Sequence, residues 1–194
     1  MEEINKNNKF ETETETTNLN RYNIRIINKE NSIKTIELDI ERTFPDLGLF
    51  KDGNPMTDDL REILQAFVTS RPDIGYVQGL SYIAGMLLFY MDKFQAFVAL
   101  MNIVLNFNTL PFYRFDESQI RKRIILFKQL FFHNLPDLCD HFESESILPE
   151  CYFVEWMMTL FAKNINIDIA ARIWDLYMLE GIKSIYQAAI GKPL

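Results

Sequence analysis

Two short stretches of the sequence carry polar side chains that could do chemistry. In "IELDIERTF", Asp39 and Arg42 are three residues apart, which on a helix places them on one face, where a carboxylate can orient a guanidinium. In "DIGYVQG", Gly75 and Gly79 enclose a tight turn that can present the amide of Gln78 just before a long apolar run. Each stretch also has an ordinary explanation, a surface ion pair in the first and a helix-start cap in the second. Taken singly, neither stretch decides between a chemical role and its ordinary explanation.

Other groups that could do chemistry lack the spacing of a known type of site. The sequence has no GxxxxGK[ST] loop for a nucleoside triphosphate, and no GxSxG motif accompanies its serines. Its two histidines are His133 and His141, and Asp137 and His141 are four residues apart and could share a helical face. Without a third ligand, surface polar residues are favoured over a metal site. We therefore expect no metal, no cofactor of the protein's own and no self-contained hydrolase.

Composition limits the class of protein. With 194 residues and 48% hydrophobic content, the chain can bury one sizeable core but not two. Its 27 acidic and 20 basic side chains give a net charge of -7, without a Lys/Arg stripe, which argues against a nucleic-acid partner. The two cysteines, Cys139 and Cys151, have no CxxC spacing and favour a reducing compartment. The expected location is cytoplasmic.

Two parts of the sequence bear on domain organisation. Residues 1–30 are rich in Asn, Glu and Thr, with an ETETET repeat, and predict a disordered polar tail without a targeting signal. The domain is therefore expected over residues 31–194. Within it, "LSYIAGMLLFYM" and "FQAFVALMNIVL" are each too short for a membrane span, and Asp92 and Lys93 lie between them. They predict two buried helices and no direct membrane insertion.

The elements that must position these side chains are predicted to be helices. Apolar residues recur at helical spacing almost everywhere after residue 31, and strand alternation and hairpin dipeptides are absent. The predicted fold is an all-α single domain of about seven or eight helices. Helix starts are expected at Ser32, at Thr57 and at Asp116 or Ser118, and two further helices over "PECYFVEWMMTLFAK" and "IDIAARIWDLYMLEG". Aromatic residues at helical spacing predict core positions for Phe127, Phe131, Phe132, Trp156, Phe161 and Trp174.

Three motifs occur in a fixed order along the chain. They are Ile36-x-x-Asp39-x-x-Arg42, then Tyr76-x-Gln78-Gly79, then "RIWDLYMLEG". In this order and spacing they resemble the TBC-domain family of GTPase-activating proteins for Rab-type small GTPases. The similarity runs from about residue 32 to residue 190.

The resemblance implies roles for five residues. In this family an arginine and a glutamine enter the active site of the partner GTPase, and these catalytic roles fall on Arg42 and Gln78. Asp39 would orient Arg42, Tyr76 would pack beside the same guanidinium, and Gly79 would let the backbone bend into the next helix. GTP and Mg²⁺ would belong to the partner, so the protein would regulate an enzyme without being one.

The resemblance also implies a setting and leaves one alternative open. The partner would be a Rab-type GTPase, and the process vesicle trafficking, with the protein recruited to endomembranes. Family members usually have a further N-terminal helical segment and several helices after the "IWD" helix, so we expect a partial domain that lacks the usual C-terminal helices. The alternative is a non-catalytic module that binds a small GTPase or a trafficking partner without activating it.

Overall fold

Helices make up all the regular secondary structure of the part of the chain that this computed structural model describes, residues 32–51 and 53–191. No strand occurs in those residues, so the prediction of an all-α fold is confirmed. The predicted tail, residues 1–30, lies outside the described residues.

The helices outnumber the seven or eight expected, because several predicted helices are split and short ones intervene. The first covers residues 32–41. It is followed by η1 (Pro45–Leu47), α2 (Pro55–Ser70), α3 (Leu80–Leu88), α4 (Lys93–Leu105), α5 (Leu110–Tyr113), α6 (Glu117–Asn134), α7 (Pro136–Ser144), η2 (Pro149–Cys151), α8 (Phe153–Thr159), α9 (Ile167–Glu180) and α10 (Ile182–Ala189).

Side-chain caps begin four of the described helices, α2, α4, α6 and α9, although one predicted helix start was wrong. Asp116 caps α6 by accepting a hydrogen bond from the Gln119 amide at 3.1 Å. The helix predicted to begin at Thr57 begins earlier, because Asn54 accepts a hydrogen bond from the Met56 amide at 2.9 Å and proline occupies the first helical position. Thr57 lies buried in the first turn of this helix.

The helix predicted over residues 149–163 is interrupted. The chain there forms η2, then α8, and then leaves the helical conformation at Leu160 and Phe161, whose φ angles are 46° and 66°. The indole Nε1 of buried Trp174 donates a hydrogen bond to the Leu160 carbonyl at 2.8 Å. This bond satisfies a backbone oxygen near the early helix end, which a pattern of apolar residues could not predict.

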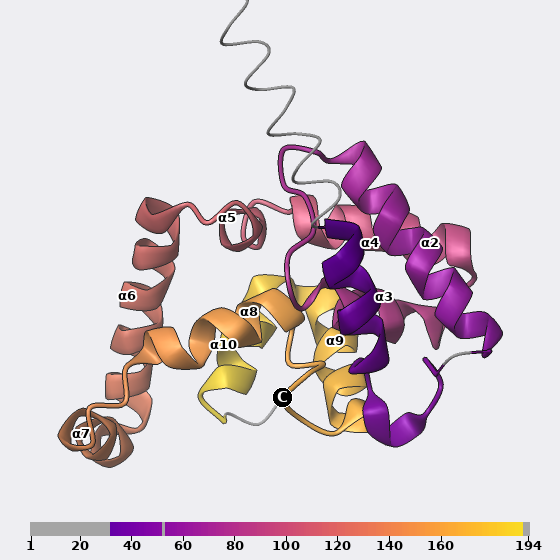
Figure 1. Cartoon of the computed structure of the whole chain (residues 1–194). Helices are drawn as coiled ribbons and strands as arrows, with labels where there is room; N and C mark the ends of the chain where they lie inside the picture. Colours follow the sequence, from indigo (N-terminus) through magenta and orange to yellow (C-terminus); the bar gives the residue numbers. More distant parts are fainter. Residues whose placement is uncertain (1–31, 52, 192–194) are drawn as a thin grey trace, which may run out of the picture.

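The core is centred on α3, which packs against α2, α4 and α8. Leu80, Ile83 and Ala84 of this helix are fully buried, so the run that raised the membrane question is core. No helix in the described part of the chain is long and apolar enough to cross a membrane. In Figure 1, α2, α3 and α4 lie on one side of the molecule and α6 and α7 on the other, with α8 and α10 between them.

The aromatic predictions mostly hold. Phe127 and Phe153 stack with ring centroids 4.3 Å apart, and Phe131 and Phe161 are also buried. Phe132, which was predicted to lie in the core, is 59% exposed. Its ring falls on the outer side of α6, since a helix presents consecutive residues in different directions.

Replacing Trp174 by Phe should destabilise the fold by about 2 kcal/mol, because the Leu160 carbonyl would lose its buried donor. Urea denaturation followed by circular dichroism measures this change. Leu179→Ala, at an exposed position of the same helix, is the control and should change stability by less than about 0.5 kcal/mol. Equal effects of the two substitutions would contradict the role of the indole bond.

Candidate functional site

The site is built around the buried carboxylate of Asp39, which is 2% exposed. Its Oδ1 accepts a hydrogen bond from Arg42 Nε at 2.6 Å and also pairs with Arg42 Nη2, while its Oδ2 accepts one from the Tyr76 hydroxyl at 2.6 Å. The Arg42 side chain itself is 53% exposed. Asp39 therefore holds one edge of a guanidinium whose other edge faces out of the protein.

Tyr76 supports Arg42 through this carboxylate. The contact that the structure gives is the hydroxyl bond to Asp39, where the sequence predicted packing of the ring beside the guanidinium. Burial, together with the hydrogen bond to Asp39, raises the pKa of Tyr76 above its ordinary value. The hydroxyl therefore stays protonated at neutral pH and remains a donor.

The loop that carries Gln78 and the first turn of α3 are tied to the first helix and the turn after it at three further points. The Tyr76 amide donates to Ser32 Oγ at 3.2 Å, and the hydroxyls of Thr43 and Ser81 are hydrogen-bonded at 2.8 Å. The Tyr82 hydroxyl donates to the Arg42 carbonyl at 2.7 Å. Ser32 was predicted as a helix cap, and its bond to Tyr76 was missed because the two residues are far apart in the sequence.

Gly79 shapes the end of this loop. It is the N-cap of α3 with φ 104°, a conformation that residues with a side chain rarely adopt. A Cβ atom there would lie 3.1 Å from Cγ2 of Thr159 on α8. A glycine is thus required both for the bend and for the close approach of α8.

All five predicted site residues line one cavity of about 630 Å³: Asp39, Arg42, Tyr76, Gln78 and Gly79. The Gln78 side chain is exposed and makes no hydrogen bond within the described part of the chain. It is therefore not the helix cap that was the ordinary explanation for this amide.

The opposite wall of the cavity was not predicted from the sequence. It comes from α8, the turn after it and the α5–α6 connection, and includes Phe115, Glu155 and Lys163. Glu155 pairs with Lys163 and accepts a hydrogen bond from Asn164 Nδ2 at 2.8 Å, and the bond from Lys163 lowers the pKa of this carboxyl. Arg42 and Lys163 thus place two cations at one cavity, each paired with a carboxylate of the same lining, Asp39 and Glu155.

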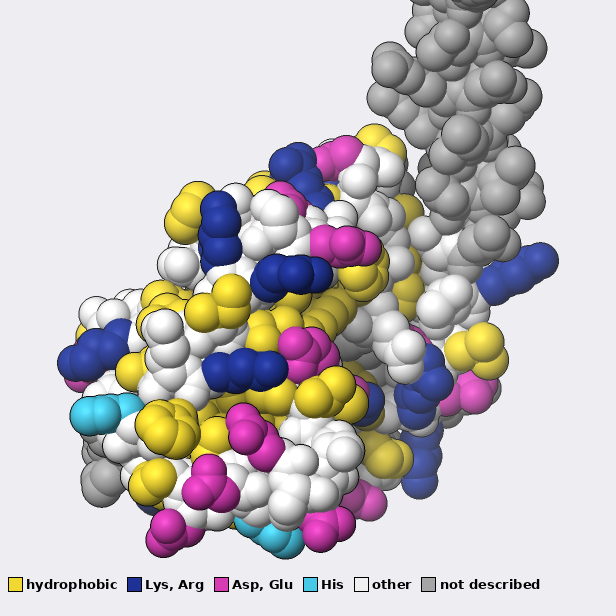
Figure 2. All heavy atoms as spheres, turned by 90° about the vertical axis from the view of Figure 1, so that its left-hand side faces the viewer, with side chains coloured by type: hydrophobic (Ala, Val, Ile, Leu, Met, Phe, Trp, Pro, Cys, Tyr) yellow, Lys and Arg dark blue, Asp and Glu magenta, His cyan; other side chains and the backbone are white. Residues whose placement is uncertain are grey.

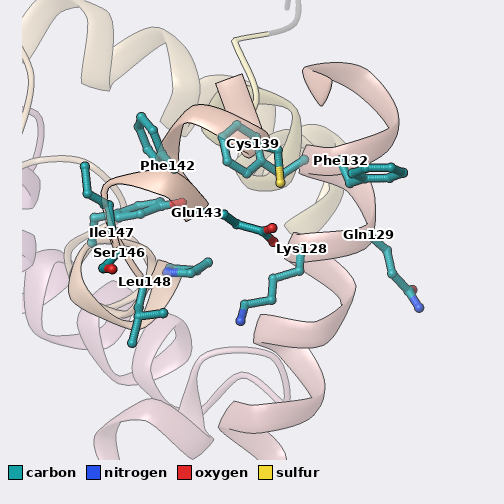
Figure 3. A pocket seen from close by; sticks show the side chains of 12 residues that line it. Lys128, Gln129, Phe132, Cys139, Phe142, Glu143, Ser146, Ile147 and Leu148 are labelled. Carbon is teal, nitrogen blue, oxygen red and sulfur yellow. The ribbon is translucent and has the colours of Figure 1, made fainter. Parts of the chain in front are cut away.

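A second cavity, of about 590 Å³, lies between α6, α7 and η2, and none of the five predicted site residues lines it. Figure 2 shows this side of the molecule, where apolar side chains line a hollow bordered by charged ones. In Figure 3 the side chains of Lys128 and Glu143 extend toward the middle of the cavity, and Phe132 lies at its edge. Burial raises the pKa of Tyr152, whose hydroxyl has no partner in the described residues, to about 12.

The two histidines line neither of these cavities. No group of His, Cys, Asp and Glu in residues 32–51 and 53–191 could hold a metal ion. His133 and His141 are both exposed, which agrees with the sequence interpretation of His141 and Asp137 as surface polar residues.

Comparison with known proteins identifies the family. The model of the Rab-GTPase-TBC domain matches residues 2–191. The chain belongs to this family. The match begins within the stretch predicted as a tail, which lies outside the described residues, and it continues through the last described helix of the TBC domain.

Relatives with similar sequences include three proteins. TBC1 domain family member 12 of Xenopus tropicalis is 39% identical over 166 residues, covering 86% of this chain and 24% of the relative. TBC1 domain family member 14 of Homo sapiens is 38% identical over 163 residues, covering 84% of this chain and 24% of the relative. Drainin of Dictyostelium discoideum is 41% identical over 152 residues, covering 78% and 35%. The chain thus spans about a quarter to a third of these relatives' length.

A solved structure supports the fold. The crystal structure of the Chlamydomonas flagellar RabGAP TBC domain superimposes with a TM-score of 0.69 and 24% sequence identity, covering 87% of this chain and 58% of that one. The all-α arrangement is therefore that of a TBC domain.

Replacing Gly79 by Ala should destabilise the TBC domain by about 1–3 kcal/mol, because the positive φ and the contact with Thr159 both oppose a Cβ. Denaturant titration measures the effect. Gly53→Ala is the matched control, since Gly53 has φ 85° but no neighbour near its Cβ position.

The contact itself is tested by combining Gly79→Ala with Thr159→Ser, which removes Cγ2 and keeps the hydroxyl that donates to the Glu155 carbonyl. The double variant should recover at least about 0.5 kcal/mol relative to additivity. Strict additivity would show that the approach of α8 is not what requires the glycine.

Proposed function

We propose that this TBC domain accelerates the hydrolysis of GTP bound to a Rab-type small GTPase, and that Arg42 and Gln78 are the catalytic residues it supplies in trans. The observation that carries the proposal is that the exposed Arg42 guanidinium and the unbonded Gln78 amide line one cavity. The hydrogen bond between buried Asp39 and partly buried Tyr76 holds their two segments together.

Arg42 has the chemistry and the freedom that such a role needs. Hydrolysis of GTP requires stabilisation of the negative charge on the transferring phosphoryl group. A guanidinium is always charged and can bind two phosphate oxygens at once, which an ammonium cannot do. Nε and Nη2 are directed to Asp39, and Nη1 makes no hydrogen bond within the described residues, so the outer edge is free for a phosphate.

Gln78 suits the second role, the orientation of the attacking water. A carboxamide has both a donor and an acceptor and can hold a water and a phosphate oxygen without adding negative charge. The bend at Gly79 and the bond of the Tyr76 amide to Ser32 fix the backbone on either side of it. GTP and Mg²⁺ would be bound by the partner.

The proposed setting follows from the proposed partner. Rab-type GTPases act in vesicle trafficking, so the TBC domain would work in the cytoplasm and be recruited to endomembranes through the GTPase. The names of the solved TBC structure and of the matching family model support a Rab partner.

Release of phosphate from a panel of GTP-loaded Rab proteins tests the proposal. The wild-type domain should accelerate hydrolysis by at least one member, and Arg42→Ala should lower kcat/KM about a thousand-fold or more, since the phosphoryl charge loses its guanidinium. Gln78→Ala should also remove most of the acceleration. Arg172→Ala is the control, because Arg172 is exposed on α9 and does not line the cavity.

Two results would contradict the proposal. One is acceleration that survives both Arg42→Ala and Gln78→Ala. The other is binding of GTP-loaded Rab by the wild-type domain with no acceleration, which would establish the alternative of a non-catalytic interaction module.

Tyr76→Phe should lower kcat/KM about tenfold, because Asp39 loses a hydrogen bond and holds the guanidinium less firmly. The same substitution in the Arg42→Ala background should have almost no further effect, since the residue acts through the arginine. A full tenfold loss in that background would show that Tyr76 contributes by another route.

A further inference from the structure

Phe115 is an exposed aromatic residue in an unfavourable backbone conformation. It lies in the connection between α5 and α6 with φ 52°, and it is 64% exposed. A left-handed conformation is costly for a bulky residue, and exposure of an aromatic ring to water adds to that cost. Strained residues of this kind are concentrated at binding and catalytic sites.

The residues on either side of Phe115 are fixed, so the ring is held outward. The hydroxyl of buried Tyr113 donates to the Met158 carbonyl at 2.6 Å, and Arg114 pairs with Asp73 at 2.8 Å. On the other side, the Asp116 amide donates to the Pro111 carbonyl at 2.9 Å, and the Asp116 side chain caps α6. These contacts fix the connection on both sides of Phe115. The residue therefore keeps its left-handed backbone, and its ring does not enter the core.

Phe115 lines the same cavity as Arg42 and Gln78. A partner whose nucleotide site receives these two side chains must cover the mouth of that cavity, and it would then cover Phe115 as well. An aromatic side chain that becomes buried at the centre of an interface commonly contributes much of the binding free energy.

We propose that Phe115 is an apolar anchor for the GTP-loaded GTPase, which would bury the ring against apolar surface beside its nucleotide site. This inference rests on the proposed function and names a residue that determines affinity for the partner. Because the contact is made before and during the reaction alike, it should act on KM and leave kcat almost unchanged.

The test uses Phe115→Asn, because asparagine tolerates a left-handed backbone better than other residues with side chains. The variant should melt at the same temperature as the wild-type domain or higher, yet show at least a tenfold higher KM in the phosphate-release assay. Phe115→Ala should raise KM similarly. Phe132→Ala is the matched control, since Phe132 is 59% exposed on α6 but lines the other cavity (Figure 3).

A second readout is the affinity of each variant for GTP-loaded GTPase, measured by fluorescence anisotropy without turnover. If the wild-type domain accelerates hydrolysis and Phe115→Asn has the KM and affinity of the wild type, the anchor is overturned and the proposed function stands. If the wild-type domain binds without acceleration and Phe115→Asn weakens that binding tenfold, the anchor stands and the proposed function fails.

Light scattering tests whether the exposed ring serves self-association of this chain instead. If Phe115→Asn converts a dimer of this chain to a monomer and leaves GTPase affinity unchanged, the ring serves self-association and the anchor is overturned. A wild-type domain that binds no small GTPase in the panel overturns it equally.

Discussion

Asp39 places a carboxylate in the protein interior, where an unpaired charge would cost several kcal/mol. The structure satisfies this charge from two directions, with the guanidinium of Arg42 and the hydroxyl of Tyr76. These donors come from different segments of the chain, so the need to satisfy one buried group brings the two catalytic candidates together. The rest of the site, including the bond between Ser32 and the Tyr76 amide, reinforces that junction.

The second wall of the cavity depends on a different constraint, the early end of α8. Because Leu160 and Phe161 leave the helical conformation, Lys163 turns back to pair with Glu155. The same helix end brings Thr159 against Gly79. The shape of the cavity is therefore set by a helix that stops and a glycine that allows the neighbouring loop to approach it.

The sequence predicted the residues of the cavity wall that contains Asp39, Arg42 and Gly79, but not those of the opposite wall. Local spacing placed Asp39 and Arg42 on one helical face and gave Gly79 a backbone role, but only the order of the three motifs, through the resemblance to the TBC family, joined these residues into one site. Apolar periodicity likewise predicted the helices and the buried α3. The pairing of Glu155 with Lys163 depends on left-handed residues that have no glycine or asparagine to indicate them. Phe115 gave no signal either, since its exposure follows from how its neighbours are anchored.

The first helix also sets how often the site is complete. A helix as short as residues 32–41 is only marginally stable by itself in water, so its attachment to the Tyr76 loop maintains it. Arg42 follows directly at its end. Because Ile36 and Ile40 of this helix are buried in the core, displacing the helix would cost the core those contacts and would also carry the arginine away from the cavity. The population of molecules with a complete site, and with it the apparent affinity for any ligand of the cavity, is therefore tied to the stability of the core.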